Sequence, residues 1–314
     1  MNNQREVIII GGGALGLCTA YYLWQSAFKV TIIEKNEIGS GCSYGNAGLI
    51  VPSHIIPLAA PGVIAKGLQW MFNPASPFYL KPRFDPAFIS WLWQFSRSCN
   101  AAHLRRAVPL LHALCQSSAK LFDEMKQSQA FAFDLEKRGL LMLYQTAKEL
   151  QAEQHAVELA REMGMAVNNL EPAQIRELDT NLATNVCGGV YYPNDCHLDP
   201  TQLVNALAAF LRERGVPMLT NTEALQLHAT RGKISKLKTS RGDFSADAFV
   251  LASGAWAPEL LKPLRLRLPL LRERIEGRLR PARRAMKELA RESGALAYFP
   301  RVAADLSGVY ETIA

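Results

Sequence analysis

Residues 6–34 read EVIIIGGGALGLCTAYYLWQSAFKVTIIE, and this stretch decides the fold class. Residues 6–10 are dominated by an apolar run of the kind found in strands that are buried in a parallel sheet. Three glycines follow, the pattern then predicts a helix over 14–26, and a second apolar strand is predicted over 29–33. Together these segments predict a β-α-β unit and therefore parallel sheet. The residues expected on the apolar face of the helix are Leu15, Cys18, Tyr22 and Leu23.

The glycines between the first strand and the helix follow the pattern G-x-G-x-x-G, with Gly11, Gly13 and Gly16 at the fixed positions. In a strand–turn–helix context, the first glycine permits the tight turn and the second lets the backbone approach a pyrophosphate. The third allows the helix to pack closely on the strand. The helix N-terminus adds free N–H groups and the positive end of its dipole, so this turn is predicted to bind a dinucleotide.

Glu34 ends the second strand, where an acidic side chain accepts hydrogen bonds from the ribose hydroxyls of a bound dinucleotide. A carboxylate there would repel a 2′-phosphate, which disfavours NADP. The alternative is a surface carboxylate paired with Lys35. The fingerprint alone does not distinguish FAD from NAD.

Residues 39–50 read GSGCSYGNAGLI and are rich in small side chains. Such a run lets the backbone pass close to a flat ligand or to a second stretch of phosphate. The alternative is an ordinary flexible surface loop.

The remainder of the chain predicts a mixed α/β protein, with a kink at Pro109 and a helix start at Asp199-Pro200. Short turns are expected at Arg231-Gly232 and Arg241-Gly242. The further helices are predicted over 86–98, 103–126, 147–163 and 200–214, and the further strands over 140–144, 216–220, 223–229, 233–239 and 248–252.

Composition places the chain among soluble globular proteins, since 49% of its residues are hydrophobic and 20% are charged. Residues 262–314 hold 12 Lys and Arg against 6 Asp and Glu, whereas the whole chain holds 35 against 28. The rest of the chain is therefore nearly neutral, which argues against a nucleic-acid-binding face. Six scattered cysteines without a Cys-x-x-Cys pair favour a reducing compartment, and neither a signal peptide nor a spanning helix is expected.

Two further places in the sequence hold polar side chains that could bind a metal ion or act on a substrate. The alternation Asp195-x-His197-x-Asp199 could converge on a metal ion, but capping of the helix at Asp199-Pro200 explains it more simply, so no metal is predicted. His54 is the one histidine that follows the small-residue run. It could face a substrate, or it could bond to nearby backbone.

Several motifs together resemble one family, the FAD-dependent D-amino acid dehydrogenases of the D-amino acid oxidase-like superfamily. The resemblance covers residues 5 to about 270. The motifs are GSGCSYGNAGLIVPSHIIPLAAPG (39–62), GLQWMF (67–72), SPFY (76–79), DCHLDP (195–200) and LASGAW (251–256).

This resemblance implies a Rossmann-type FAD-binding domain of the glutathione reductase type, interleaved with an incomplete α+β substrate domain. Its expected segments are 1–55 and 196–262 for FAD, 56–195 for substrate, and an atypical basic tail over 263–314. FAD is the implied cofactor, and no metal ion is expected. His54 is the candidate catalytic residue. The cofactor-binding residues carried over are Gly11, Gly13, Ala14, Leu15, Gly16, Glu34, Lys35, Ser43, Asn46, Ala47, Gly48, Ala224 and Gly254.

The implied activity is the oxidative deamination of D-amino acids. A hydride passes from the substrate Cα to flavin N5, and water then hydrolyses the imino acid to a keto acid and ammonia. The implied partners are an amino acid substrate and an electron acceptor such as a quinone, and no nucleic acid is expected. The expected location is the cytoplasm, with peripheral membrane contact possible. The alternatives are an inactive truncated flavoprotein and an NAD-dependent Rossmann dehydrogenase.

The resemblance ends where the basic tail begins. The family continues with further strands and with Arg or Tyr residues for the substrate carboxylate, and these motifs are not found after Leu270. The abrupt change of charge suggests a frameshifted or otherwise non-native C-terminus. The alternative is a genuine basic helix over 278–292 that docks on a membrane or a partner.

Overall fold

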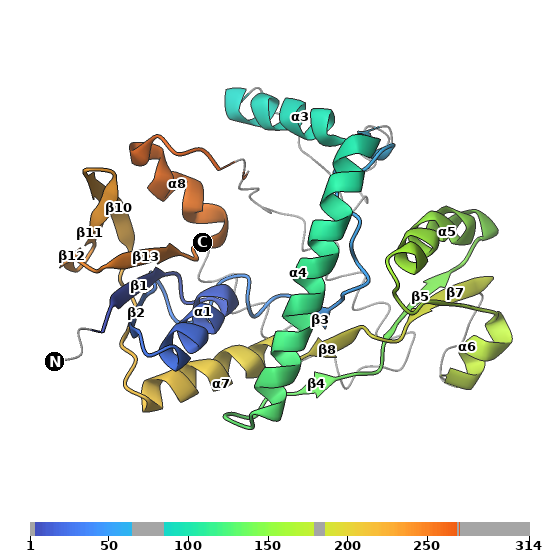
Figure 1. Ribbon diagram of the computed structural model, residues 1–314, viewed down its shortest axis with the longest axis horizontal. Helices are drawn as coiled ribbons and strands as arrows, with labels where there is room; N and C mark the ends of the chain where they lie inside the picture. The colour runs from blue at the N-terminus through green and yellow to red at the C-terminus, as the bar shows by residue number, and fades with distance from the viewer. Residues whose placement is uncertain (1–3, 65–84, 179–185, 269, 271–314) are drawn as a thin grey trace, which may run out of the picture. The chain divides into compact units, whose positions relative to one another are not determined.

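The computed structural model describes residues 4–64, 85–178, 186–268 and 270 (Figure 1). Most of the predicted basic tail and the whole of the GLQWMF and SPFY motifs lie outside these residues. The chain divides into two compact units, one made of Met1–Ala47 with Pro200–Ala314, as far as these are described, and one made of Gly48–Asp199. The expected functional segments of the two domains stay predictions.

The first unit is built on a four-stranded parallel sheet in the order β13-β1-β2-β9. The predicted β-α-β unit is confirmed, since β1 and β2 pair in parallel from Glu6 opposite Lys29 to Ile10 opposite Ile33. The elements of this unit are β1 (Glu6–Ile10), α1 (Ala14–Gln25), β2 (Lys29–Ile33), α7 (Pro200–Glu213), β9 (Met218–Leu219), β10 (Ala224–Thr230), β11 (Lys233–Thr239), β12 (Gly242–Phe244), β13 (Ala248–Leu251), η1 (Gly254–Trp256), α8 (Ala257–Leu261) and η2 (Lys262–Leu264).

Alternate side chains of β1 pack on opposite faces of this sheet, as strand geometry requires. On one face, Ile8 and Ile10 join a cluster with Leu227, Leu237 and Leu260 from the segments β10, β11 and α8. On the other face, Ile9 is fully buried on the side of α1. Helices α1 and α7 lie against each other in Figure 1.

The face that α1 buries differs from the expected one. Its buried residues are Gly16, Leu17, Ala20 and Tyr21, whereas Leu15 is 66% exposed. The prediction for Leu15 was wrong because close packing at Gly16 sets the rotation of the helix on the sheet. Tyr21 then contacts Phe210 of α7, with ring centroids 5.5 Å apart.

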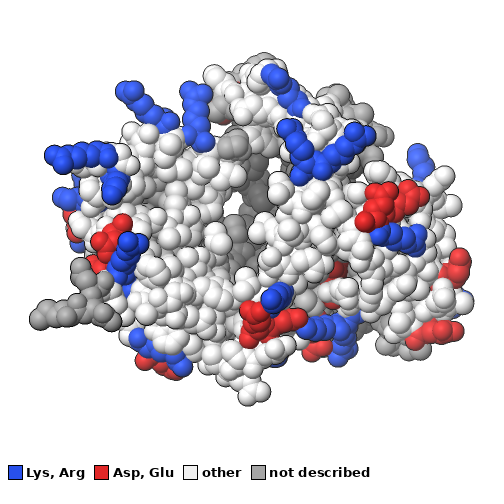
Figure 2. Space-filling model, viewed as in Figure 1, with Lys and Arg blue, Asp and Glu red and all other residues white. Residues whose placement is uncertain are grey.

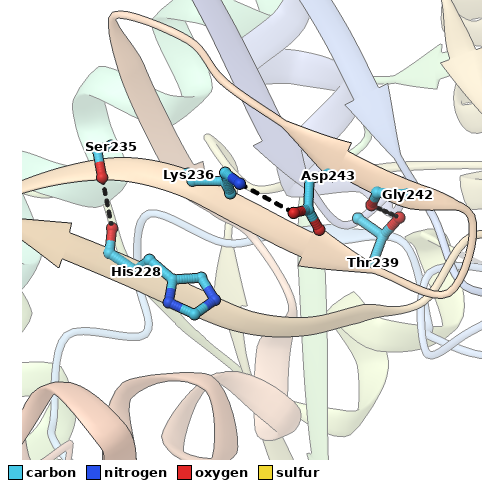
Figure 3. Close-up of polar contacts among 6 residues, drawn as sticks. All are labelled: His228, Ser235, Lys236, Thr239, Gly242 and Asp243. Carbon is cyan, nitrogen blue, oxygen red and sulfur yellow. Dashed lines mark hydrogen bonds and ion pairs between the residues drawn. The ribbon is translucent and has the colours of Figure 1, made fainter.

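The three strands β10, β11 and β12 form an antiparallel meander, which Figure 3 shows in close-up. Both predicted turns are present. Arg231 and Gly232 have φ of 53° and 78°, and Gly242 has φ of 118°. The second turn is closed by the Thr239 hydroxyl, which donates to the Gly242 carbonyl oxygen at 2.7 Å.

The second unit holds two three-stranded sheets, β3-β8-β4 and β5-β7-β6, with helices beside them. The cluster of Val157, Val167, Val190 and Tyr192 packs α5 onto the second of these sheets. The elements are β3 (Leu49–Ile50), α3 (Pro86–Ser98), α4 (Ala101–Gln127), β4 (Leu135–Glu136), β5 (Leu140–Tyr144), α5 (Ala147–Glu162), β6 (Asn168–Leu170), α6 (Pro172–Leu178), β7 (Gly188–Tyr192) and β8 (Cys196–Leu198).

Charged side chains of both signs are interspersed on the face drawn in Figure 2. Exposed ion pairs include Lys137–Asp123 at 2.6 Å and Lys236–Asp243 at 3.0 Å, the latter drawn in Figure 3. Such pairs each contribute at most about 1 kcal/mol to stability. The stability of each unit therefore comes mainly from the packing of its own apolar core. Within the described residues, no helix combines the length and apolarity needed to cross a membrane.

Candidate cofactor site

The glycine turn lies between β1 and α1 and is tightly packed on both sides. Gly11 has φ of +117°, and a Cβ at this position would lie 2.4 Å from the carbonyl oxygen of Ala252. A Cβ at Gly16 would lie only 1.9 Å from the carbonyl oxygen of Gly11. Real Cβ atoms do not approach oxygen this closely, so both positions require glycine.

Gly13 stands at the N-cap of α1 and plays a different part. Its backbone is extended, with φ of −79° and ψ of −176°, and no side chain caps the helix there. A Cβ on Gly13 would meet one neighbouring atom, the Ser43 Oγ, at 2.9 Å. This hydroxyl accepts the Ala14 N–H at 2.8 Å. The Ser43 hydroxyl therefore caps the first amide of the helix, while residue 13 itself places no side chain in front of the turn, and Leu15 is exposed beside it.

Glu34 is brought directly to the glycine turn. Its Oε2 accepts the Gly12 N–H at 2.7 Å, and its Oε1 accepts the Asn36 N–H at 3.0 Å. These two backbone N–H groups hold the carboxylate, rather than Lys35 as in the alternative of a surface ion pair. Instead, Lys35 places its Nζ 4.5 Å from the centre of the Trp256 ring, a cation–π contact within the same unit.

Residues 39–47 fold back onto the first unit and are anchored through Tyr44. Its hydroxyl lies 3.0 Å from the Ile38 carbonyl oxygen and 2.8 Å from Asn205 Oδ1 on α7. Burial raises the pKa of Tyr44, and the charge of Arg212 partly offsets this. The Asn46 side chain donates to the Ser43 carbonyl oxygen at 2.6 Å. The segment is thus an ordered part of the unit that carries the glycine turn, with Ala47 exposed at its end.

The remaining predicted cofactor residues fall in three places. Gly254 opens the turn after β13, is exposed, and has φ of +52°. Gly48 begins the second unit, where its carbonyl oxygen accepts the Leu198 N–H at 2.8 Å. Ala224 starts β10 and packs against the core cluster that contains Ile8. Ala224 therefore lies on the meander side of the sheet.

The turn after β13 also brings a polar atom that the sequence did not single out. Ser253 N lies 3.1 Å from the Cβ position of Gly11, so this residue adjoins the glycine turn. The Ser253 Oγ is buried, and no hydrogen-bond partner for it exists among the described residues. A buried hydroxyl without a partner is costly, which marks this position as one where a ligand atom would stabilise the protein.

His54 belongs to the second unit and is exposed. Its Nδ1 lies 3.0 Å from the Ser53 Oγ, and the same oxygen lies 2.5 Å from Oδ2 of the buried Asp195. Neither Ser53 nor Asp195 was predicted to act with His54. Ser53 and Asp195 are 142 positions apart in the chain, so no local spacing signals their contact.

The Asp195-x-His197-x-Asp199 alternation does not form a cluster. Asp195 is 1% exposed and bonded to Ser53, while His197 is exposed on β8. Over the ranges that the structure describes, no three His, Cys, Asp or Glu side chains gather as they would around a metal ion.

Two solved structures illustrate the fold. The glycine oxidase of Bacillus cereus superposes with a TM-score of 0.60 over 83% of this chain and 58% of its own, at 22% identity. The L-amino acid deaminase of Proteus vulgaris superposes with a TM-score of 0.59 over 85% of this chain and 51% of its own, at 17% identity. These likenesses show the fold.

Curated relatives are similar in sequence as well. The D-amino acid dehydrogenase of Rhizorhabdus wittichii is 31% identical over 269 residues, which cover 84% of this chain and 65% of that protein. The D-amino acid dehydrogenase of Vibrio atlanticus is 30% identical and is covered to 64%. The chain thus spans about two thirds of the length of these relatives or slightly less.

The family model described as DAO, FAD dependent oxidoreductase, matches residues 6–306. This match covers the glycine turn, Glu34 and the 39–47 segment, and it extends into the basic tail. FAD is the cofactor of that family. The chain therefore belongs to the DAO family of FAD-dependent oxidoreductases.

Proposed function

We propose that this protein is an FAD-dependent D-amino acid dehydrogenase. The observation that carries the proposal is the glycine turn, where Gly13 puts no side chain at the N-terminus of α1, beside the carboxylate of Glu34 and the capping hydroxyl of Ser43. Such an arrangement suits the diphosphate and ribose of a dinucleotide. The curated relatives named D-amino acid dehydrogenase support the substrate class.

The chain offers a consistent set of groups to the cofactor. The N–H groups of Gly11, Gly12 and Ala14 already donate within the protein, so other amides of the turn would bind the diphosphate. Glu34 retains lone pairs for ribose hydroxyls after accepting its two backbone bonds. Lys35 and Gly254 would lie beside these groups. The residues proposed for the diphosphate are Gly11, Gly13, Ala14, Leu15 and Gly16.

The small-residue segment would serve the other end of the cofactor. Ser43, Asn46 and Ala47 lie in the same unit as the glycine turn and would approach the inner phosphate and the flavin, with Gly48 following them. Ala224 would support this site through the core, since it packs near Ile8 of β1.

We also propose that residues 1–55 and 196–262 form the FAD-binding domain and 56–195 the substrate domain.

When bound, FAD supplies the hydride acceptor for oxidation at the substrate Cα. The protein's own part is to bind and orient the amino acid, with its amine neutral when the hydride leaves. His54 is the candidate residue for this amine. Water then hydrolyses the imino acid to a keto acid and ammonia, and a quinone or another carrier takes the electrons.

Reduction of an artificial electron dye tests this function. The FAD-loaded protein should reduce the dye with D-alanine or another D-amino acid and should be inactive with the matching L-enantiomers. Anaerobic addition of the same substrate should bleach the visible flavin band. Equal rates with both enantiomers, or bound FAD that no D-amino acid bleaches, would contradict the proposal.

A further inference from the structure

Asp195 is a buried carboxylate whose two oxygens both accept hydrogen bonds from one residue. The Ser53 N–H donates to Oδ1 at 3.1 Å and the Ser53 hydroxyl to Oδ2 at 2.5 Å. The Asp195 backbone is fixed as well, because its carbonyl oxygen accepts the Gly139 N–H at 3.0 Å. Burial raises the pKa of Asp195, and the two bonds from Ser53 oppose that shift by stabilising the charged form. A carboxylate held in this way is rigid and acts only as an acceptor.

The proton count at Ser53 fixes the state of His54. A serine hydroxyl has one proton, and here that proton points to Asp195. Towards Nδ1 of His54, 3.0 Å away, the oxygen can then only accept a hydrogen bond. Nδ1 must therefore carry a proton, which leaves the lone pair of the neutral ring on Nε2. His54 is exposed as a residue among the described part of the chain.

Three titratable groups in the described part of this unit lie near this chain of bonds. On β7, Tyr192 lies with its ring 6.4 Å from the His54 ring, and its hydroxyl donates to Glu153 of α5 at 3.4 Å. Burial and Glu153 raise the pKa of Tyr192 to about 12, so it stays neutral. Burial raises the pKa of the Cys115 thiol on α4 and of the Cys196 thiol on β8. The negative charge of Asp195 adds to this effect at both thiols.

We infer that Asp195 is a positioning residue, which acts through Ser53 to hold His54 as the Nδ1–H tautomer with Nε2 ready to accept a proton. The use made of this tautomer rests on the proposed function. An amino acid in its ammonium form would give one proton to Nε2, so that an N–H bond of the substrate breaks and the Nε2–H bond forms. The amine lone pair is then free when the hydride leaves, and the exposed imidazolium returns its proton to water.

The Asp195→Asn variant tests the relay because it should reverse the direction of the bonds. The new amide can donate to the Ser53 oxygen, which frees the serine proton to point at Nδ1 of His54. The expected result is a change of His54 from the Nδ1–H to the Nε2–H tautomer. Long-range nitrogen–proton correlation spectra of ¹⁵N-histidine-labelled protein report the tautomer, and loss of the signal in His54→Gln assigns it.

Two serine variants keep the test independent of any damage to the fold. Ser53→Thr retains the hydroxyl and should keep the Nδ1–H form. Ser53→Ala removes the hydroxyl but leaves the backbone bond to Asp195, and it should release His54 to a tautomer mixture. The exposed His197 provides a control signal that should not change. An Nε2–H tautomer in the unmodified protein, or an Nδ1–H form that persists in Asp195→Asn, would overturn the relay.

Kinetics test the use of the relay. In the dye assay, Asp195→Asn should lower kcat about 100-fold, with KM changed less than about threefold, because a general base contributes about 100-fold or more. Ser53→Thr should keep most of the activity. A tautomer change with unchanged kcat would overturn the role in the reaction. If the unmodified protein turns over no D-amino acid, the proposed function fails, while the spectra still decide the relay.

Discussion

Substitution of Gly16 by alanine is expected to destroy the packing of the first unit. The new Cβ would lie 1.9 Å from the Gly11 carbonyl oxygen. Neither atom can rotate away, because the backbone fixes the position of both. Relief requires α1 to shift off β1, where Leu17 and Ala20 are fully buried. We expect a loss of at least about 3 kcal/mol in the free energy of unfolding, at the upper end for an overpacked core. Urea unfolding followed by circular dichroism measures it.

Gly41→Ala is the matched control for Gly16. Gly41 lies in the same unit, no atom lies within 4 Å of its Cβ position, and its φ is outside the left-handed region. Alanine there should leave the unfolding free energy within about 1 kcal/mol of the unmodified protein. Equal stability of the Gly16 and Gly41 variants would show that the close approach of helix and strand is not what the structure depicts.

Substitution of Gly13 by valine should separate cofactor binding from folding. The backbone of Gly13 suits any residue, and within the described residues the only close neighbour of its Cβ position is the hydroxyl of Ser43. The fold should therefore survive, but two methyl groups would now stand in front of the α1 N-terminus. Because the backbone amides can no longer approach a diphosphate, we expect the Kd for FAD to rise at least about 100-fold.

Quenching of flavin fluorescence on titration measures this loss, and the urea midpoint of the same sample shows that the variant is folded. Gly13→Val with the stability of the unmodified protein and the same Kd for FAD would place the diphosphate elsewhere. A variant that fails to fold would contradict the assignment of Ser43 as the only neighbour of this position.

The parts of this molecule that the sequence predicted are those governed by local chemistry. The apolar runs and the glycine spacing predicted β1, α1 and β2, and Arg231-Gly232 predicted a turn because glycine adopts positive φ without strain. The face of α1 was predicted wrongly, since it depends on how closely Gly16 approaches the strand. Short strands such as β3 and β8 were missed, because two or three residues carry no measurable period.

The site shows the same division. Glu34 was singled out because its position follows from the length of one β-α-β unit, and the structure places its carboxylate on the Gly12 amide. The link between Ser53 and Asp195 could not be predicted, since it joins residues far apart in the chain. Ser253 was likewise seen as part of a strand-end motif, whereas its buried hydroxyl emerges only from the packing around Gly11. The roles of the predicted cofactor residues stay predictions.

The most direct test of the central claim is a side-by-side titration of the unmodified protein with FAD and with NAD. The account predicts one FAD bound per chain, with a yellow complex that survives gel filtration and a rise in the thermal unfolding midpoint. NAD at the same concentration should change neither property. Binding of NAD in preference to FAD, or a protein that stays colourless and unshifted with excess FAD, would contradict the account.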